Sequence, residues 1–168
     1  MRYLFLGLAL AVSAPSSTFA AESVGAQYEN EIVLKGQVVD IVCELTGNCT
    51  KECGEGKRVL GLKTDDSTIY LIAKGPPLFA NANESVLPFC AKPIEVDGLL
   101  IKNPKMPLLF VQRYRAAGSA DWKDADGFEV AWKARNGESD EWFRKDPLVV
   151  EIVKKSGPLG IPGLAPKP

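Results

Sequence analysis

Residues 32–43, IVLKGQVVDIVC, carry the strongest signal for the architecture of this chain. Val and Ile dominate the stretch, and apolar residues occupy neighbouring positions at Val38–Val39 and Ile41–Val42. Apolar side chains on both faces are typical of a long strand that is buried on both sides. Gly36 lies in the middle, where the lack of a side chain permits a bend. The stretch therefore predicts a long first strand over Ile32–Cys43, bent at Gly36.

Shorter strand patterns follow this first strand. The predicted elements are strands at 58–64, 68–74, 93–101 and 108–115, with one or two helical turns at 84–90 between the second and third of these. The first two are separated by the polar turn Asp65-Asp66-Ser67 and form a hairpin. The side chains predicted to face its core are Leu60, Leu62, Ile69, Leu71 and Ala73. Those predicted to point outward from the second strand are Thr68, Tyr70, Ile72 and Lys74.

In the order of these elements, residues 31–115 resemble the OB-fold, a five-stranded Greek-key barrel. The turn Cys90-Ala91-Lys92 leads into Pro-Ile-Glu-Val-Asp-Gly, which is similar to the entry to strand four in small bacterial exported OB-fold proteins. Ala91 stands where a glycine is usual. The predicted fold class is mainly β: an OB-like five-stranded Greek-key barrel with a short helical insert and a C-terminal extension carrying short helices. A generic small β-barrel or sandwich is the alternative.

The N-terminal residues have the pattern of a secretory signal peptide. Arg2 precedes the apolar run Leu4–Val12, and Thr18-Phe19-Ala20 fits a cleavage site with small residues. We expect cleavage after Ala20 and a Sec-type route to the periplasm or the cell exterior. The run is too short to span a bilayer, which needs about 20 residues, and we predict no transmembrane segment in the mature chain.

All four cysteines, Cys43, Cys49, Cys53 and Cys90, follow the predicted signal peptide. An even number of cysteines in an exported domain predicts disulfides. In an OB barrel the first strand runs antiparallel to the fourth, so the resemblance implies the pairs Cys43–Cys90 and Cys49–Cys53. One alternative is a tetrathiolate zinc or iron–sulfur site, although the spacing lacks the usual Cys-x2-Cys knuckle. Another is a redox-active Cys49/Cys53 pair.

The composition changes after residue 115. The predicted organisation is a signal peptide (1–20), an OB-like barrel (31–115), a Trp-containing extension (116–156) and a Pro/Gly-rich tail (157–168). The extension has helical patterns at 128–135 and 147–155. Asp146 is placed as N-cap of the second helix, Pro147 at its first position and Gly157 after its end. The apolar face of this helix comprises Leu148, Val149, Ile152 and Val153.

The extension and tail supply the candidate partner-binding residues. One interpretation is that the tryptophans pack the extension onto the barrel. The other is that they form an interface, because Trp and Arg are favoured anchors at protein contacts. The candidates are Trp122, Trp132, Trp142, Arg144, Leu159 and Ile161.

Composition excludes several function classes. The chain has 168 residues, 20 basic and 21 acidic side chains and no histidine. It therefore lacks Ser-His-Asp or Cys-His catalysis and histidine metal ligation, and it has no basic excess for nucleic acid. We predict no catalytic residue and no cofactor. The predicted function is an exported, disulfide-stabilised OB-like binding or accessory module that contacts an exported or membrane-complex protein. The metal-binding or thiol-redox protein is the alternative.

Overall fold

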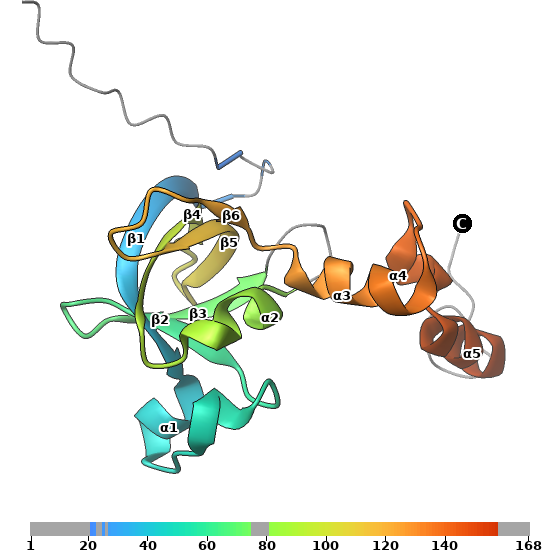
Figure 1. The fold of residues 1–168 in the computed structure, drawn as a ribbon, viewed down its shortest axis with the longest axis horizontal. Helices are drawn as coiled ribbons and strands as arrows, with labels where there is room; N and C mark the ends of the chain where they lie inside the picture. The colour runs from blue at the N-terminus through green and yellow to red at the C-terminus, as the bar shows by residue number, and fades with distance from the viewer. Residues whose placement is uncertain (1–20, 23–24, 26, 75–80, 158–168) are drawn as a thin grey trace, which may run out of the picture.

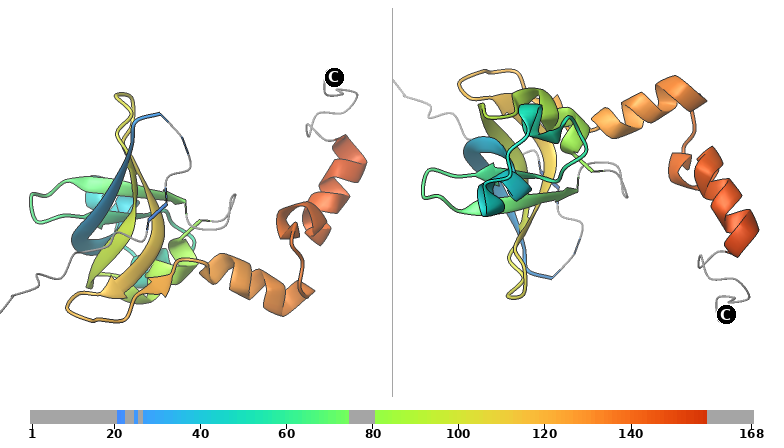
Figure 2. Two further views of the ribbon diagram at one scale, coloured as in Figure 1. Left: turned by 90° about the horizontal axis from the view of Figure 1, so that it is seen from above. Right: turned by 90° about the horizontal axis from the view of Figure 1, so that it is seen from below.

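The structure, a computed structural model, describes residues 21–22, 25, 27–74 and 81–157. They form a β-barrel with a helical arm that extends away from it (Figures 1 and 2). The strands are β1 (Glu29–Asp40), β2 (Leu60–Lys63), β3 (Ile69–Lys74), β4 (Pro93–Ile101), β5 (Leu108–Ala116) and β6 (Lys123–Asp124). The barrel also carries α1 (Ile41–Thr46), η1 (Lys51–Gly54), α2 (Asn83–Val86) and η2 (Leu87–Phe89). The helical arm consists of α3 (Gly127–Asn136), α4 (Trp142–Lys145) and α5 (Pro147–Ser156).

Strand pairing closes the sheet into a barrel. The order is β3-β2-β1-β4-β5-β6, and β3 also pairs with β5 in parallel, which joins the two ends of the five-stranded part. The other pairs are antiparallel. This is the connectivity of an OB barrel, so the predicted OB-like fold class is confirmed.

Gly36 lies where β1 passes from one neighbour to the other. β1 pairs with β4 up to Gln37 and with β2 from Gln37 onward. A Cβ atom at position 36 would lie 2.6 Å from the carbonyl oxygen of Lys63. Only glycine therefore lets the backbones of β1 and β2 approach this closely.

The core fills the barrel with aliphatic side chains. Its fully buried members include Val38, Leu60, Leu62, Ile72, Ile94, Val96, Leu109 and Val111. The predicted inward side chains of β2, Leu60 and Leu62, are buried, so that prediction is confirmed. For β3 the prediction of which face points into the core was wrong. Ile72 is buried and Tyr70 packs against the core, whereas Ala73 is exposed. Both faces of β3 are apolar, so alternation alone does not choose between them. The pairing of Tyr70 with Leu62, whose side chain points inward, determines which face of β3 points into the core.

The end of the first strand also differs from the prediction. β1 ends at Asp40, and Ile41–Cys43 belong to α1. Asp40 Oδ1 accepts hydrogen bonds from the backbone N–H groups of Val42 and Cys43, which is the geometry of a helix N-cap. A single capping side chain thus overrides the β preference of the Ile-Val pair.

The predicted helices are present. α2 and η2 together span residues 83–89, one residue short of the expected end at 90, and α3 covers 128–135. In α5, Asp146 Oδ1 accepts from the N–H groups of Leu148 and Val149, Pro147 is the first residue, and Gly157 follows the last turn. The predicted signal peptide and all of the tail after Gly157 lie outside the described residues. Within those residues, no helix combines the length and apolar character needed to cross a bilayer.

Candidate functional site

Three of the four cysteines lie in the loop between β1 and β2, residues 41–59, here called the cysteine loop, and Cys90 lies between η2 and β4. The disulfide pairs are Cys43–Cys49 and Cys53–Cys90, with Cα–Cα distances of 4.3 and 5.7 Å. Two disulfides are therefore confirmed, but the expected pairs Cys43–Cys90 and Cys49–Cys53 are wrong. Because all four sulfurs are bonded in pairs, no thiolate is left for the tetrathiolate site, and the Cys49/Cys53 redox pair is not formed. No cluster of three or more potential metal ligands occurs in the described part of the chain.

Strand register explains the different pairing. Pro93, the first residue of β4, lies opposite Gln37, and Cys90 forms a bridge with Val38. Cys90 therefore lies beside Val38, five residues before Cys43 in the sequence. Cys43 itself lies in α1, after the end of β1. Gly47 ends α1 with a φ of 72°, and its N–H donates to the carbonyl oxygen of Cys43. The chain thus reverses and returns Cys49 to Cys43.

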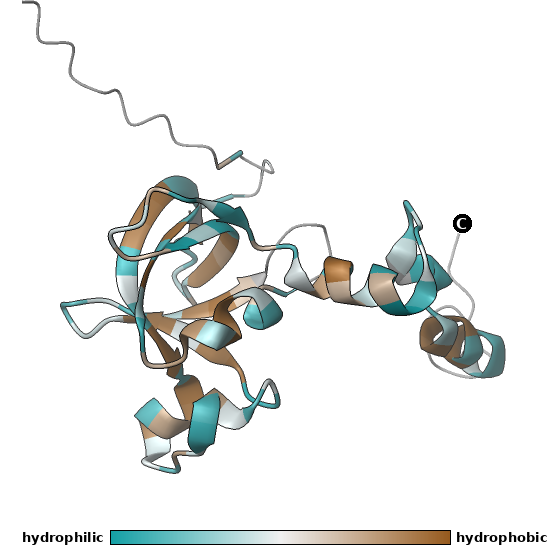
Figure 3. Cartoon of the chain, in the orientation of Figure 1, coloured by the Kyte–Doolittle hydropathy of each residue, from teal (hydrophilic) through white to brown (hydrophobic). Residues whose placement is uncertain are grey.

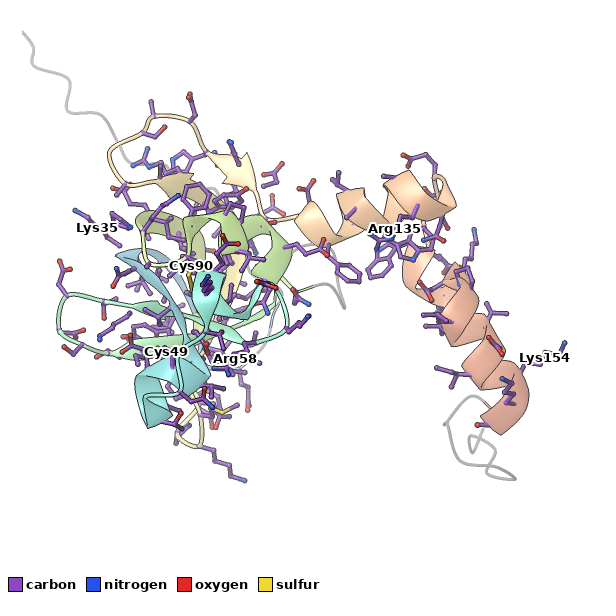
Figure 4. The ribbon with its side chains drawn as sticks, turned by 60° about the horizontal axis from the view of Figure 1, so that its bottom comes forward. Lys35, Cys49, Arg58, Cys90, Arg135 and Lys154 are labelled. Atoms are coloured by element: carbon purple, nitrogen blue, oxygen red, sulfur yellow. A yellow bond between two sulfur atoms is a disulfide. The ribbon has the colours of Figure 1, made fainter. Side chains whose placement is uncertain are left out.

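Asp40 and Arg58 hold the cysteine loop against the barrel. Arg58 Nη1 donates to Asp40 Oδ2 at 3.0 Å and to the carbonyl oxygen of Asn48 at 2.5 Å. The Asp40 side chain is only 3% exposed. Figure 4 labels Arg58 close to Cys49 on this loop. One carboxylate therefore caps α1 and anchors both ends of the loop.

Trp122 packs on the barrel. Its ring lies under the guanidinium carbons of Arg113 and Arg115, which are 5.5 and 4.3 Å from the ring centroid. Arg115 Nη2 also pairs with Glu95 at 2.5 Å, across the β4–β5 ladder. Trp122 is half-buried by this stack. The packing interpretation is therefore correct for this tryptophan.

The other two tryptophans pack inside the helical arm instead of against the barrel. Trp132 and Trp142 are 4% and 6% exposed, and their ring centroids are 5.8 Å apart. Phe128 completes this cluster at 5.2 Å from Trp142. Trp132 Nε1 donates to Asp146 Oδ2, which links α3 to the first turn of α5. The arm therefore has a small core of its own. It meets the barrel where the Gly127 N–H donates to Ser85 Oγ at 2.9 Å.

Helix α5, at the far end of the arm, carries hydrophobic residues along one side (Figure 3), and their side chains are exposed. The exposed fractions are 70% for Leu148, 40% for Val149, 51% for Val150, 57% for Ile152 and 41% for Val153. At about 100° per residue, these five side chains cover an arc of about 200°. Glu151, Lys154 and Lys155 occupy the rest of the circumference. We call these five residues the α5 apolar face.

The α5 apolar face is the exposed site that the list of candidate residues missed. The helical spacing of Leu148, Val149, Ile152 and Val153 identified the face itself, but spacing does not show whether anything covers it. Among the other candidates, Arg144 is exposed on α4 and pairs with Glu141 at 3.5 Å. Leu159 and Ile161 lie outside the described residues.

The surface predicted to point outward from the β2–β3 hairpin is turned inward at two of its residues. Tyr70, the aromatic residue assigned to that surface, packs against the core, and Ile72 is 2% exposed.

Comparison with known protein families, with curated proteins and with solved structures found no match.

Proposed function

We propose that this chain is an exported, disulfide-stabilised OB-like module that binds a partner protein through the α5 apolar face. The observation that carries the proposal is the exposure of five neighbouring aliphatic side chains at the end of the arm. Apolar patches with a polar rim mark interaction sites on soluble proteins. The two disulfides fit an oxidising compartment, which supports the export part of the proposal.

The helical arm presents α5 already folded. An isolated helix of ten residues is marginal in water. Here Asp146 caps the first turn and also accepts the indole N–H of Trp132, so the start of α5 is fixed to α3. A helix that is formed before binding avoids part of the ordering cost of association. In this proposal Trp132 and Trp142 act by supporting α5 and not by contacting the partner.

The width of the α5 apolar face specifies the kind of partner. A surface helix needs an apolar stripe of about 100° to pack on one neighbour, whereas this face covers about twice that angle. A flat partner surface would leave part of it in water, and an apolar groove would cover it. The proposed partner is therefore an exported or membrane-complex protein with an apolar groove. The exposed Arg144 precedes α5 in the sequence, and we assign it to the rim of the contact. Leu159 and Ile161 follow α5 in the sequence and remain candidate partner-binding residues.

A second copy of the chain is a poorer fit for this face. A helix of ten residues is about 15 Å long. A stable interface buries about 800 Å² on each partner, which is more than one such helix offers to another.

The experiment places a photo-crosslinking amino acid at Ile152 of the full-length protein in its native host. Val59, an apolar residue that is 48% exposed at the end of the cysteine loop, provides the matched control position. The captured protein is identified, purified and titrated with the unmodified chain and with two variants. Ile152→Asp should weaken binding at least about tenfold, equivalent to about 1.4 kcal/mol, and Glu151→Gln should change it less than about twofold.

Any of four outcomes would contradict the proposal. The first is crosslinking of the same protein from Val59 and Ile152 alike. The second is crosslinking only between copies of this chain. The third is equal affinity of Ile152→Asp and the unmodified chain for the purified partner. The fourth is a crosslink from Ile152 to lipid alone.

A further inference from the structure

The first half of β1 has an open edge. On one side β1 pairs with β4 from Glu29 to Gln37, whereas β2 joins its other side only from Gln37 onward. Among the described strands, β4 is therefore the one neighbour of residues 29–36. A strand with an unpaired edge presents backbone N–H and C=O groups that can pair with another strand. Figure 1 shows β1 on the side of the barrel away from the helical arm.

Hydrogen bonds at the end of β1 show which residues point to the open edge. The Val38 N–H donates to the carbonyl oxygen of Lys92, just before β4, so the backbone of Val38 faces β4. Successive residues of a strand direct their backbone groups to opposite edges, and the register with β4 has no break between residues 29 and 37. The residues whose N–H and C=O groups point to the open edge are therefore Glu31, Val33 and Lys35.

The β2–β3 hairpin does not continue the ladder along this edge. The backbones of β1 and β2 are in close contact at Gly36, where an added Cβ atom would lie 2.6 Å from the carbonyl oxygen of Lys63. Beyond that point the hairpin turn diverges from β1, and a cavity of about 230 Å³ opens between them. Its wall includes Lys35 and Gly36 on one side and Thr64 and Asp65 on the other.

The three residues of the open edge also have exposed side chains. Val33 is 41% exposed, and Glu31 and Lys35 are exposed two positions before and after it. Figure 4 labels Lys35 on the side of the barrel away from the arm. Charges on an edge strand usually oppose pairing with another chain. Here the two charges have opposite signs and are placed symmetrically about Val33, so an identical strand that runs in the opposite direction would bring each charge to its complement.

We propose that the open edge of β1 binds the open edge of β1 in a second copy of this chain. In an antiparallel pairing centred on Val33, Val33 of one copy lies opposite Val33 of the other, and Glu31 lies opposite Lys35. The arrangement has twofold symmetry, so the same surface serves both copies. Each opposed pair exchanges two backbone hydrogen bonds. Opposite charges directly across a ladder stabilise it, whereas like charges weaken it.

Backbone hydrogen bonds distinguish this edge from the α5 apolar face as a surface for a second copy. Main-chain hydrogen bonds supply the affinity when a strand is added to a sheet edge, and two helices cannot supply them to each other. Three opposed residue pairs form a short interface, so we expect a dimer that dissociates on dilution. The edge contains no residue of the α5 apolar face, and this inference does not depend on partner binding by α5.

Charge reversal in the whole chain tests the register. Glu31→Lys and Lys35→Glu each place like charges opposite each other, and the double variant exchanges the charges and restores both pairs. In sedimentation equilibrium, the dimer dissociation constant should rise at least about tenfold in each single variant and return to within about threefold in the double variant. An equimolar mixture of the two single variants should form a heterodimer, because it again opposes Lys and Glu at both positions.

The control for these variants is Lys105→Glu, which reverses an exposed charge in the turn between β4 and β5 and should change the dissociation constant less than about twofold. Three results of sedimentation would overturn the proposal. They are an unmodified chain that stays monomeric at about 1 mM, a dimer that neither single variant weakens, and single variants that fail to associate when mixed.

Hydrogen exchange of the unmodified chain tests the contact without any variant. At concentrations that favour the dimer, the amides of Glu31, Val33 and Lys35 should exchange more slowly than in dilute protein. The amides of Ile32 and Leu34 point to β4 and should keep the same exchange rates. New protection that appears elsewhere and leaves the three edge amides unchanged would also overturn the proposal.

Discussion

Ala91 adopts a backbone conformation that glycine adopts more readily, with a φ of 57°. It is fixed there by two hydrogen bonds: its N–H donates to Val38, and its carbonyl oxygen accepts from Gln37 Nε2. The position is therefore the one where the OB resemblance led us to expect glycine, and alanine is strained in it. A left-handed conformation costs alanine about 1–2 kcal/mol. Glycine would avoid this strain, but its greater conformational freedom in the unfolded chain would offset part of the gain in stability.

We expect Ala91→Gly to raise the free energy of unfolding by about 1 kcal/mol, measured by urea titration. Ala116→Gly is the control, because Ala116 is exposed at the end of β5 and does not have a positive φ. It should lower the free energy of unfolding by about 0.5–1 kcal/mol. If the Ala91→Gly variant is less stable than the unmodified protein, the backbone of Ala91 is not strained as argued.

Asp40 performs two tasks with one buried carboxylate, which caps α1 and pairs with Arg58. Asp40→Ala would remove the cap and leave the Arg58 guanidinium without this partner. Removing one member of such a buried pair costs about 3 kcal/mol, and we expect that loss in urea unfolding. The control is Glu44→Ala, which removes the more exposed ion pair to Lys63 and should cost less than about 1 kcal/mol. Equal losses would show that Asp40 has no special role.

At the scale of single elements, the start of α5 is sensitive to acid. The indole N–H of Trp132 lowers the pKa of Asp146, and the backbone N–H groups of Val149 and Leu148 lower it further. The folded-state pKa is therefore below the unfolded value of about 3.9. The stabilisation is fully present above the unfolded pKa and is lost as pH falls through the folded pKa.

An NMR pH titration of the Trp132 indole N–H signal tests this assignment. We expect the signal to shift with a midpoint below the ordinary Asp range, together with loss of protection in α5. Asp146→Asn removes the titrating group and should abolish this shift. A midpoint at or above the ordinary value would show that Asp146 does not accept the indole bond.

The elements that the sequence predicts best are those with local signals. Asp146, Pro147 and Gly157 identify both ends of α5, because each residue acts on its neighbours in the chain. The end of β1 was missed because Ile41 and Val42 fit a buried strand as well as a helix, and the deciding side chain, Asp40, is also anchored by Arg58 from 18 residues away. The facing of β3 depends on its partner strand, which a pattern with two apolar faces cannot reveal.

For the whole molecule, strand order followed from the sequence but disulfide pairing did not. The antiparallel approach of β1 and β4 is as expected, yet a register in which Cys90 meets Val38 moves it away from Cys43. Similarly, the apolar pattern of α5 was visible, but its exposure follows only from the direction of the arm (Figure 2). Pairing and exposure depend on distant contacts that spacing does not encode.

The two disulfides should contribute unequally to global stability. Cys53–Cys90 spans 37 residues and Cys43–Cys49 spans 6. By chain entropy, these loops correspond to about 4 and about 2 kcal/mol. Cys53 is also a member of the barrel core. We expect Cys53→Ala with Cys90→Ala to lower the urea midpoint more than Cys43→Ala with Cys49→Ala. The reverse order would contradict both the pairing and the role of the longer loop.

The central claim is that the barrel carries an arm whose α5 apolar face binds a partner protein. Hydrogen exchange of the whole chain, alone and saturated with the protein captured from Ile152, tests it most directly. The account predicts that new amide protection concentrates in Pro147–Ser156, while the strands of the barrel keep the protection they have in the free protein. Protection that appears on the barrel and leaves α5 unchanged would contradict it.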